Sequence, residues 1–174
     1  MATYGNSSQT KLNTSHPDLI TLFQEVVKYF DNTIVYGART PEEQFELYKK
    51  GRILIKGIWV VVKKNEVVTY KDGTEKKSKH NYDPSEAVDA IPYPIDWRDI
   101  KRMHYFAGHV KMLAIKLKEE GKITHNIRWG GDWDSDTEVK DETFMDIAHY
   151  EILNKHTLYT FHPICNRTNL VFNN

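Results

Sequence analysis

The sequence predicts a single domain of the α+β class, with a central antiparallel sheet flanked by helices. The chain has 174 residues, a length that suits one domain. Hydrophobic residues make up 40% of the chain and aromatic residues 12%, which is enough apolar mass for a core and excludes a wholly disordered chain. Helical and strand patterns are mixed along the chain without regular βαβ alternation, and this order favours an antiparallel sheet.

The first elements follow from polarity and periodicity. Residues 1–14 are polar, so we expect a flexible N-terminus there and a folded catalytic domain over residues 15–174. Ser15 can cap a helix, because apolar side chains recur at helical spacing from Leu19 to Phe30.

A strand and a second helix come next. Residues 33–37 are rich in β-branched side chains and predict a strand. Thr40, with a glutamate at position 43, predicts a capping box at the start of a helix that ends at Gly51. We expect this helix to bury two aromatic side chains, Phe45 and Tyr48.

The middle of the chain predicts a β-hairpin, a strand and a long helix. Residues 53–62 and 66–70 are expected to form the two strands of the hairpin. Residues 86–91 form the next strand, which two prolines terminate. Asp96 is expected to cap a long helix over residues 97–120.

Charge is balanced overall but unevenly distributed. The 24 basic and 24 acidic residues give no net charge, which argues against a nucleic-acid partner held by bulk charge. Residues 49–79 nevertheless carry a net charge of +7, and residues 130–151 carry −7. The acidic segment begins as a loop between predicted strands at 127–129 and 147–153. Solvated loops of opposite sign are the simpler interpretation; the alternatives are that they face each other or that the acidic loop holds a cation.

Several classes of protein are excluded by what the sequence lacks. Its one cysteine, Cys165, cannot form an intrachain disulfide or a four-cysteine zinc module. The N-terminal residues show neither a basic start nor an apolar run, so we expect no signal peptide. No stretch approaches about 18 consecutive apolar residues, so we expect no membrane segment. The expectation is a soluble monomer made in a cytoplasm.

Two segments place acids and histidines among apolar strand residues. His80 precedes a turn and Asp89 lies inside the strand that follows it, while Asp146 and His149 occur in the last strand. A carboxylate inside an apolar strand is costly to bury unless it is paired or ligates a metal. The two histidines and Asp89 therefore predict a three-ligand zinc site, with Asp146 as a general base. The alternative is two ordinary strands with structural salt bridges.

The same segments resemble a known family. Residues 78–89 (SKHNYDPSEAVD) and 146–152 (DIAHYEI) resemble the two metal-binding motifs of zinc peptidases of the hedgehog/D-Ala-D-Ala-peptidase fold. Further segments, at residues 12–22, 36–51, 88–97 and 128–133, are similar to those of phage endolysins in this group. In the family pattern the aspartate follows the first histidine by seven positions, whereas Asp89 follows His80 by nine. We expect the turn at Asp83-Pro84 to absorb the two additional residues.

The resemblance implies the chemistry of the main site. His80, Asp89 and His149 match the family's zinc ligands. Asp146 matches its catalytic acid/base, which takes a proton from the attacking water and passes it to the leaving amine.

Three further residues are implied with alternatives. Arg39 matches an arginine that polarises the scissile carbonyl or holds a substrate carboxylate, against a surface arginine that caps a helix. Ser78 is expected to hydrogen-bond near the ligands. Trp129 forms a wall of the cleft or belongs to the core.

The acidic loop begins like a calcium-binding loop but does not continue as one. Asp132, Asp134 and Asp136 alternate as in an EF-hand, yet the sixth position is not glycine and the twelfth, Thr143, is not glutamate. An EF-hand is therefore not expected. A looser calcium site is the alternative to a solvated rim of the active site.

The resemblance implies a zinc peptidase that acts on bacterial peptidoglycan, most similar to a phage L-alanyl-D-glutamate endopeptidase. The absence of a signal peptide suits an endolysin that leaves the host cytoplasm after the membrane is permeabilised. One alternative is a D-Ala-D-Ala carboxypeptidase or dipeptidase that uses the same site. The other is a non-catalytic, zinc-bearing wall-binding protein.

Overall fold

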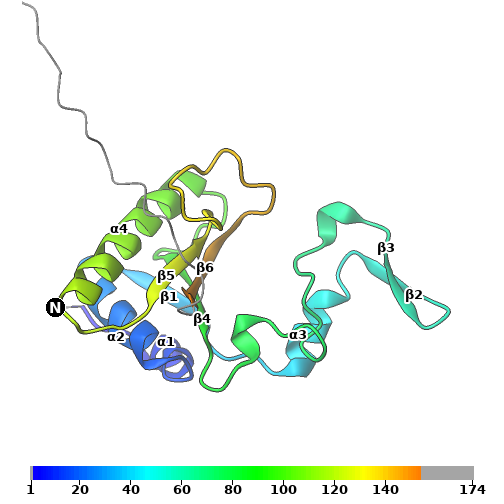
Figure 1. Cartoon of the computed structure of the whole chain (residues 1–174), viewed down its shortest axis with the longest axis horizontal. Coiled ribbons are helices and arrows are strands. Elements are labelled where there is room, and N and C mark those ends of the chain that lie inside the picture. Colours follow the sequence, from blue (N-terminus) through cyan, green and yellow to red (C-terminus); the bar gives the residue numbers. More distant parts are fainter. Residues whose placement is uncertain (1, 154–174) are drawn as a thin grey trace, which may run out of the picture.

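A four-stranded antiparallel sheet organises the computed structural model, which describes residues 2–153 (Figure 1). The sheet order is β1-β4-β6-β5, and β2 and β3 form a separate hairpin. The strands are β1 (Asn32–Tyr36), β2 (Arg52–Ile55), β3 (Ile58–Val61), β4 (Ala87–Pro92), β5 (Asn126–Gly130) and β6 (Asp146–Leu153). The helices are α1 (Asn6–Leu12), α2 (Pro17–Val26), α3 (Pro41–Tyr48) and α4 (Ile100–Glu119), with short 3-10 turns η1 (Lys64–Glu66) and η2 (Lys79–Asn81). The predicted α+β class with an antiparallel sheet is confirmed.

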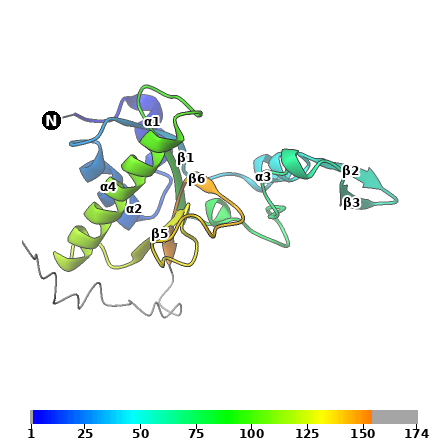
Figure 2. The same ribbon diagram turned by 90° about the horizontal axis from the view of Figure 1, so that it is seen from above.

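The sheet has one face toward the core and one toward the candidate site. Helices α1, α2 and α4 lie on one side of the sheet, and α3 with the β2–β3 hairpin extends away on the other (Figure 2). Because side chains alternate along a strand, Tyr150 and Ile152 of β6 enter the core while His149 and Glu151 face the other way. None of the helices within residues 2–153 is both long and apolar enough to span a membrane.

The N-terminal segment, which the sequence predicts to be flexible over residues 1–14, contains a helix, α1. Helix α1 occupies most of it, and the Leu12 side chain is fully buried. The helix packs on β1, where the Ile34 amide donates to Ser8 Oγ at 3.2 Å. At Gly37, a Cβ atom would lie 2.1 Å from the Lys11 carbonyl oxygen, so only glycine permits this close approach. The polar composition of this segment did not indicate a helix, because a helix this short needs few apolar side chains to pack against β1.

Two helix caps differ from those predicted. His16, not Ser15, caps α2, because His16 Nδ1 accepts from the Asp18 amide at 3.1 Å. Helix α4 begins after Asp99, whose carboxylate accepts from the Arg102 amide at 3.0 Å. Asp96, the predicted cap, forms a separate turn upstream. At the start of each helix, several residues with side chains that can cap a helix lie close together. The hydrophobic periodicity alone does not indicate which of them is the cap.

The hairpin is shorter than predicted and, apart from Arg52, lies within the first of the two expected runs, residues 53–62. Strands β2 and β3 both come from residues 52–61 and turn at Lys56-Gly57, where φ is positive at both residues. Residues 67–70 form no strand; they cross α3 instead, and Thr69 Oγ1 accepts from Gln44 Nε2 at 3.2 Å. The capping box of α3 is present, but its buried side chain is Gln44, with Phe45 and Tyr48 only half-buried.

A buried carboxylate joins the start of α2 to the segment before β5. Asp18 Oδ2 accepts from the backbone amides of Thr124 and His125, at 2.8 and 2.9 Å, and from His125 Nδ1 at 2.8 Å. Burial alone would raise the pKa of Asp18, but these hydrogen bonds outweigh it and lower the pKa below the ordinary value of 3.8.

We expect Asp18→Asn to lower the free energy of unfolding by about 1–3 kcal/mol near neutral pH, because hydrogen bonds to a charged acceptor are lost. A lowered folded-state pKa stabilises the protein above the unfolded-state pKa, and this contribution disappears as pH falls through the folded-state value. Urea unfolding of both proteins should therefore show a difference at neutral pH that shrinks below about pH 3.8. A difference that persists unchanged in acid would show that the Asp18 charge is not its source.

Candidate metal centre and active site

The register of the central strands sets two candidate ligands side by side. Asp89 on β4 is directly opposite His149 on β6. Directly opposed residues of an antiparallel pair project from the same face of the sheet. Asp89 Oδ1 consequently lies 3.1 Å from His149 Nδ1.

The third candidate ligand arrives from the 3-10 turn η2. Ser78, which is expected from the sequence to hydrogen-bond near the ligands, caps this turn, and its Oγ accepts from the His80 amide at 3.4 Å. His80 Nδ1 lies 2.6 Å from the Gly37 carbonyl oxygen. A carbonyl oxygen only accepts, so Nδ1 carries the proton and donates, which leaves the Nε2 lone pair free for the cluster.

Three ligand atoms form a compact triangle. His80 Nε2 lies 3.1 Å from Asp89 Oδ1 and 3.2 Å from His149 Nδ1. Atoms bound to one tetrahedral zinc ion at 2.0–2.1 Å lie about 3.3 Å apart. The side chains are buried or nearly so, and they converge on one point. The three predicted ligands therefore fit a single small metal ion.

The two additional residues between His80 and Asp89 do not disturb this triangle. The segment between His80 and Asp89 includes a turn whose end is fixed by Ser85, which is fully buried. The Ser85 hydroxyl donates to the Ala87 carbonyl oxygen at 2.7 Å, and the Ser85 amide donates to the Thr14 carbonyl oxygen at 2.9 Å. That the turn at Asp83-Pro84 absorbs the two additional residues stays a prediction.

Glu151 orients His149 and was not singled out from the sequence. Its Oε2 lies 3.1 Å from His149 Nε2, so that Nε2–H donates and Nδ1 faces the cluster. Glu151 is in turn bound by Arg128 of β5. Burial alone would raise the pKa of Glu151, but the hydrogen bond to His149 and the Arg128 charge lower it to about 2. Its position two residues after a strand histidine was the signal available in the sequence.

Arg39 is bound to the cluster rather than exposed at a helix start. Its side chain is only 8% exposed, and its Nη2 donates to Asp89 Oδ2 at 3.1 Å. Its Nη1 donates to Gln44 Oε1 at 2.8 Å, and Gln44 Nε2 donates to the Lys71 carbonyl oxygen at 3.0 Å. The interpretation as a surface cap is therefore wrong. Arg39 fixes the second oxygen of Asp89, so that the first faces the two histidines.

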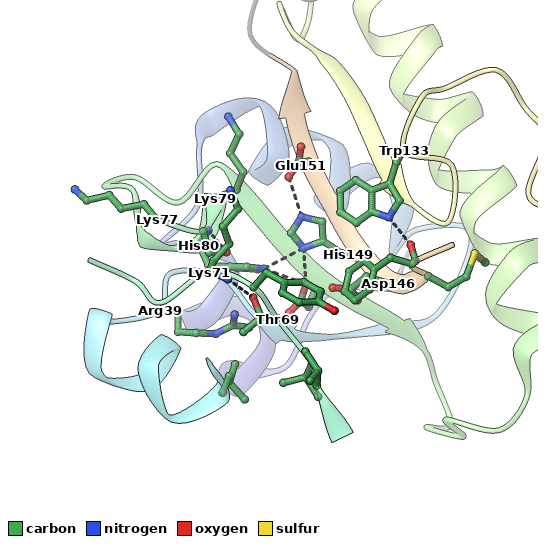
Figure 3. Close-up of a pocket in the computed structure, with 18 of the residues that line it drawn as sticks. Arg39, Thr69, Lys71, Lys77, Lys79, His80, Trp133, Asp146, His149 and Glu151 are labelled. Atoms are coloured by element: carbon green, nitrogen blue, oxygen red, sulfur yellow. Dashed lines mark hydrogen bonds and ion pairs between the residues drawn. The ribbon is translucent and has the colours of Figure 1, made fainter. Parts of the chain in front are cut away.

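The cluster lies in a pocket of about 740 Å³ between the sheet and the arm formed by α3 and residues 67–71. In Figure 3, lysines 71, 77 and 79 lie on one side of the cluster and Trp133 and Asp146 on the other. The Trp133 ring lies 5.6 Å from the His149 ring. Trp129, offered as a wall of the cleft or a core residue, belongs to the core: it is 5% exposed, and its Nε1 donates to the Ile147 carbonyl oxygen.

Asp146 lines the same pocket at the start of β6. Burial raises the pKa of Asp146; the nearby His149 opposes this shift and Asp89 adds to it. Within the cluster itself, burial would raise the pKa of Asp89, but when His80 and His149 are protonated their charges and hydrogen bonds lower it strongly. The pKa values of two carboxylates in one pocket are thus shifted in opposite directions. A lowered pKa suits Asp89 to metal ligation, and a raised pKa suits Asp146 to proton transfer.

The acidic loop also gathers carboxylates, away from the triangle. Oxygen atoms of Asp132, Asp134 and Asp136 lie within 4.8 Å of one another. Asp132 is 5% exposed, and burial raises its pKa. Calcium binding by this loop stays a prediction.

Comparison with known proteins supports one family. Residues 1–153 match the family model described as phage L-alanyl-D-glutamate peptidase. The chain is 34% identical over 127 residues to the peptidoglycan L-alanyl-D-glutamate endopeptidase CwlK of Bacillus subtilis (strain 168), a match that covers 72% of this chain and 63% of that protein. The crystal structure of Serratia marcescens L-Ala D-Glu endopeptidase ChiX has a similar fold, with a TM-score of 0.57 and 19% identity over 86% of this chain and 89% of that one. The chain belongs to the phage L-alanyl-D-glutamate peptidase family.

Proposed function

We propose that this protein is a zinc-dependent peptidase that hydrolyses the L-alanyl-D-glutamate bond of the peptidoglycan stem peptide. The observation that carries the proposal is the triangle of His80, Asp89 and His149 beside the buried Asp146. Membership of the family and the similarity to CwlK, whose name states this bond, support the substrate.

The donor set favours zinc over other metals. Two imidazoles and one carboxylate, with no sulfur among them, form a set of three protein ligands that is typical of catalytic zinc sites with one open position. When bound there, zinc would polarise the scissile carbonyl and lower the pKa of the attacking water. Glu151 and Gly37 hold the two histidine rings so that one nitrogen of each faces the ion.

Asp146 is the proposed general acid/base. Its carboxylate lies in the pocket, three residues before His149, and no ion pair within residues 2–153 engages it. Its raised pKa makes it a better proton acceptor than an exposed aspartate, so it can take a proton from water and return it to the leaving amine.

For Arg39 we propose an indirect role. Both terminal nitrogens of its guanidinium are engaged, one by Asp89 and one by Gln44. It therefore acts as a positioning residue that holds Asp89 in its ligating orientation. Lys71 and Lys77 line the same pocket and supply positive charge toward a substrate carboxylate.

The experiment that tests the function is digestion of purified peptidoglycan by the zinc-loaded protein, with mass spectrometry of the products. The expected products carry a new amino terminus on D-glutamate. Release of terminal D-alanine would instead identify a D-Ala-D-Ala carboxypeptidase, and zinc binding without any product would identify a non-catalytic wall-binding protein.

We further propose that the biological setting is lysis of a bacterial host from its cytoplasm, after the membrane has been permeabilised.

Asp146→Asn should retain zinc but lose about 10²–10⁴-fold in turnover, because the proton acceptor is removed while the ligands remain. The matched control is Asp141→Asn, since Asp141 is an exposed aspartate of the neighbouring loop. Zinc content and kcat should be measured for both. Wild-type kcat in zinc-loaded Asp146→Asn would remove this residue from the mechanism.

Glu151→Gln should weaken zinc affinity by about 10–100-fold, because an amide orients the His149 ring less firmly than a carboxylate.

His149→Ala should lower the zinc content well below one equivalent per chain. Competition with a chromogenic chelator measures both effects. Full zinc content in His149→Ala would show that the metal is held elsewhere.

Arg39→Lys should lower kcat/KM and weaken zinc affinity, since a lysine keeps the charge but cannot reach Asp89 and Gln44 together. Arg39→Ala should do the same more strongly. The comparison requires zinc affinity and kcat/KM beside the melting temperature. If only the melting temperature changed, Arg39 would be a structural residue without influence on the site.

A further inference from the structure

The β2–β3 hairpin presents an unpartnered apolar face. Cross-strand pairs place Ile53 opposite Val60 and Ile55 opposite Ile58, so these four side chains project from one face. We call them the aliphatic face. They are 48%, 39%, 45% and 68% exposed in that order. Apolar side chains gathered this way on the surface mark an interaction site more often than scattered ones do.

Two residues of the other face, Arg52 and Trp59, anchor the hairpin on α3, whereas Leu54 and Val61 of that face are 58% and 41% exposed. Trp59 packs edge-on against Phe45 of α3, with ring centroids 5.9 Å apart. Arg52 is 7% exposed; its Nη2 donates to the Thr69 carbonyl oxygen at 3.0 Å, and its guanidinium stacks over the Tyr48 ring. The hairpin therefore projects from α3, away from the sheet, in both views of the molecule (Figures 1 and 2).

The segment that contains the aliphatic face is rich in basic residues. Residues 49–79 carry ten lysines and arginines against three acids. Lys56 occupies the exposed turn between Ile55 and Ile58, and Lys64 follows β3. Neither forms an ion pair within the described part of the chain. A row of aliphatic side chains bordered by free lysines is complementary to a bilayer surface with anionic headgroups.

We propose that the β2–β3 hairpin docks the protein on membranes that contain anionic phospholipids. The aliphatic face enters the boundary between headgroups and acyl chains, and Lys56 and Lys64 contact phosphates. A second copy of the chain is a poorer occupant, because two segments of charge +7 would repel each other. A glycan strand is poorer as well, because the face offers no polar or aromatic side chain to sugar hydroxyls. None of the four residues lines the catalytic pocket, so docking leaves the pocket open.

The test is co-sedimentation of the full-length protein with vesicles of phosphatidylglycerol and phosphatidylcholine, compared with vesicles of phosphatidylcholine alone. The wild type should bind the anionic vesicles preferentially, and added salt should weaken binding because it screens the lysines. The double variant Ile55→Ser/Ile58→Ser should bind at least about tenfold more weakly. The matched control is Met112→Ser/Ile115→Ser, which removes two exposed apolar side chains of α4 and should bind as the wild type does.

Folding and activity keep this test separate from the proposed function. Circular dichroism and the kcat/KM on a soluble stem peptide should be unchanged in the hairpin variant. If that variant does not fold, Lys56→Glu/Lys64→Glu tests the electrostatic part alone and should also reduce binding.

Three results would overturn the proposal. One is equal binding of wild type and hairpin variant to anionic vesicles, and another is no preference of the wild type for anionic vesicles. The third is a concentration-dependent dimer in sedimentation velocity that the Ile55→Ser/Ile58→Ser change abolishes, which would assign the face to a second copy.

Discussion

The pairing register of β4 with β6 is the constraint on which the candidate site depends. Because Asp89 is opposite His149, a shift of one residue would turn one of the two side chains into the core. The same register sets Tyr150 and Ile152 in the core, so apolar burial enforces the alignment that the polar cluster needs. The hydrophobic core and the candidate metal centre thus lie on the two faces of one strand pairing.

The remaining groups of the site are held by hydrogen bonds from parts of the chain distant in sequence. The Gly37 carbonyl oxygen fixes the His80 ring, and Gly37 itself is pressed against the C-terminal end of α1. Gln44 joins Arg39 to residues 69–71, which line the pocket. The N-terminal helix and the α3 arm therefore support the geometry of the site, although neither contributes a ligand.

Sequence patterns predicted the sheet and the residues that converge, since both depend on features with a clear period or spacing. Acids and histidines inside apolar strands mark a position where burial must be compensated, and the structure brings His80, Asp89 and His149 together. The patterns did not predict that Glu151 orients His149, that α1 forms near the N-terminus, or where the hairpin turns. These features depend on contacts between distant parts of the chain. Glu151 contacts both Arg128 and His149. Residues 67–70 do not join the hairpin, because Thr69 contacts Gln44 instead.

The ligands proposed for zinc can be checked by X-ray absorption at the zinc edge of the zinc-loaded protein, because the spectrum reports the atoms that surround a bound ion in solution. If His80, Asp89 and His149 hold the ion, the spectrum should show four light scatterers at about 2.0–2.1 Å, two of them with the outer-shell signature of imidazole, and no sulfur. A sulfur atom at about 2.3 Å would contradict this ligand set and would implicate Cys165, the one cysteine of the chain, in place of the Asp89 triangle. A spectrum without imidazole would contradict it equally.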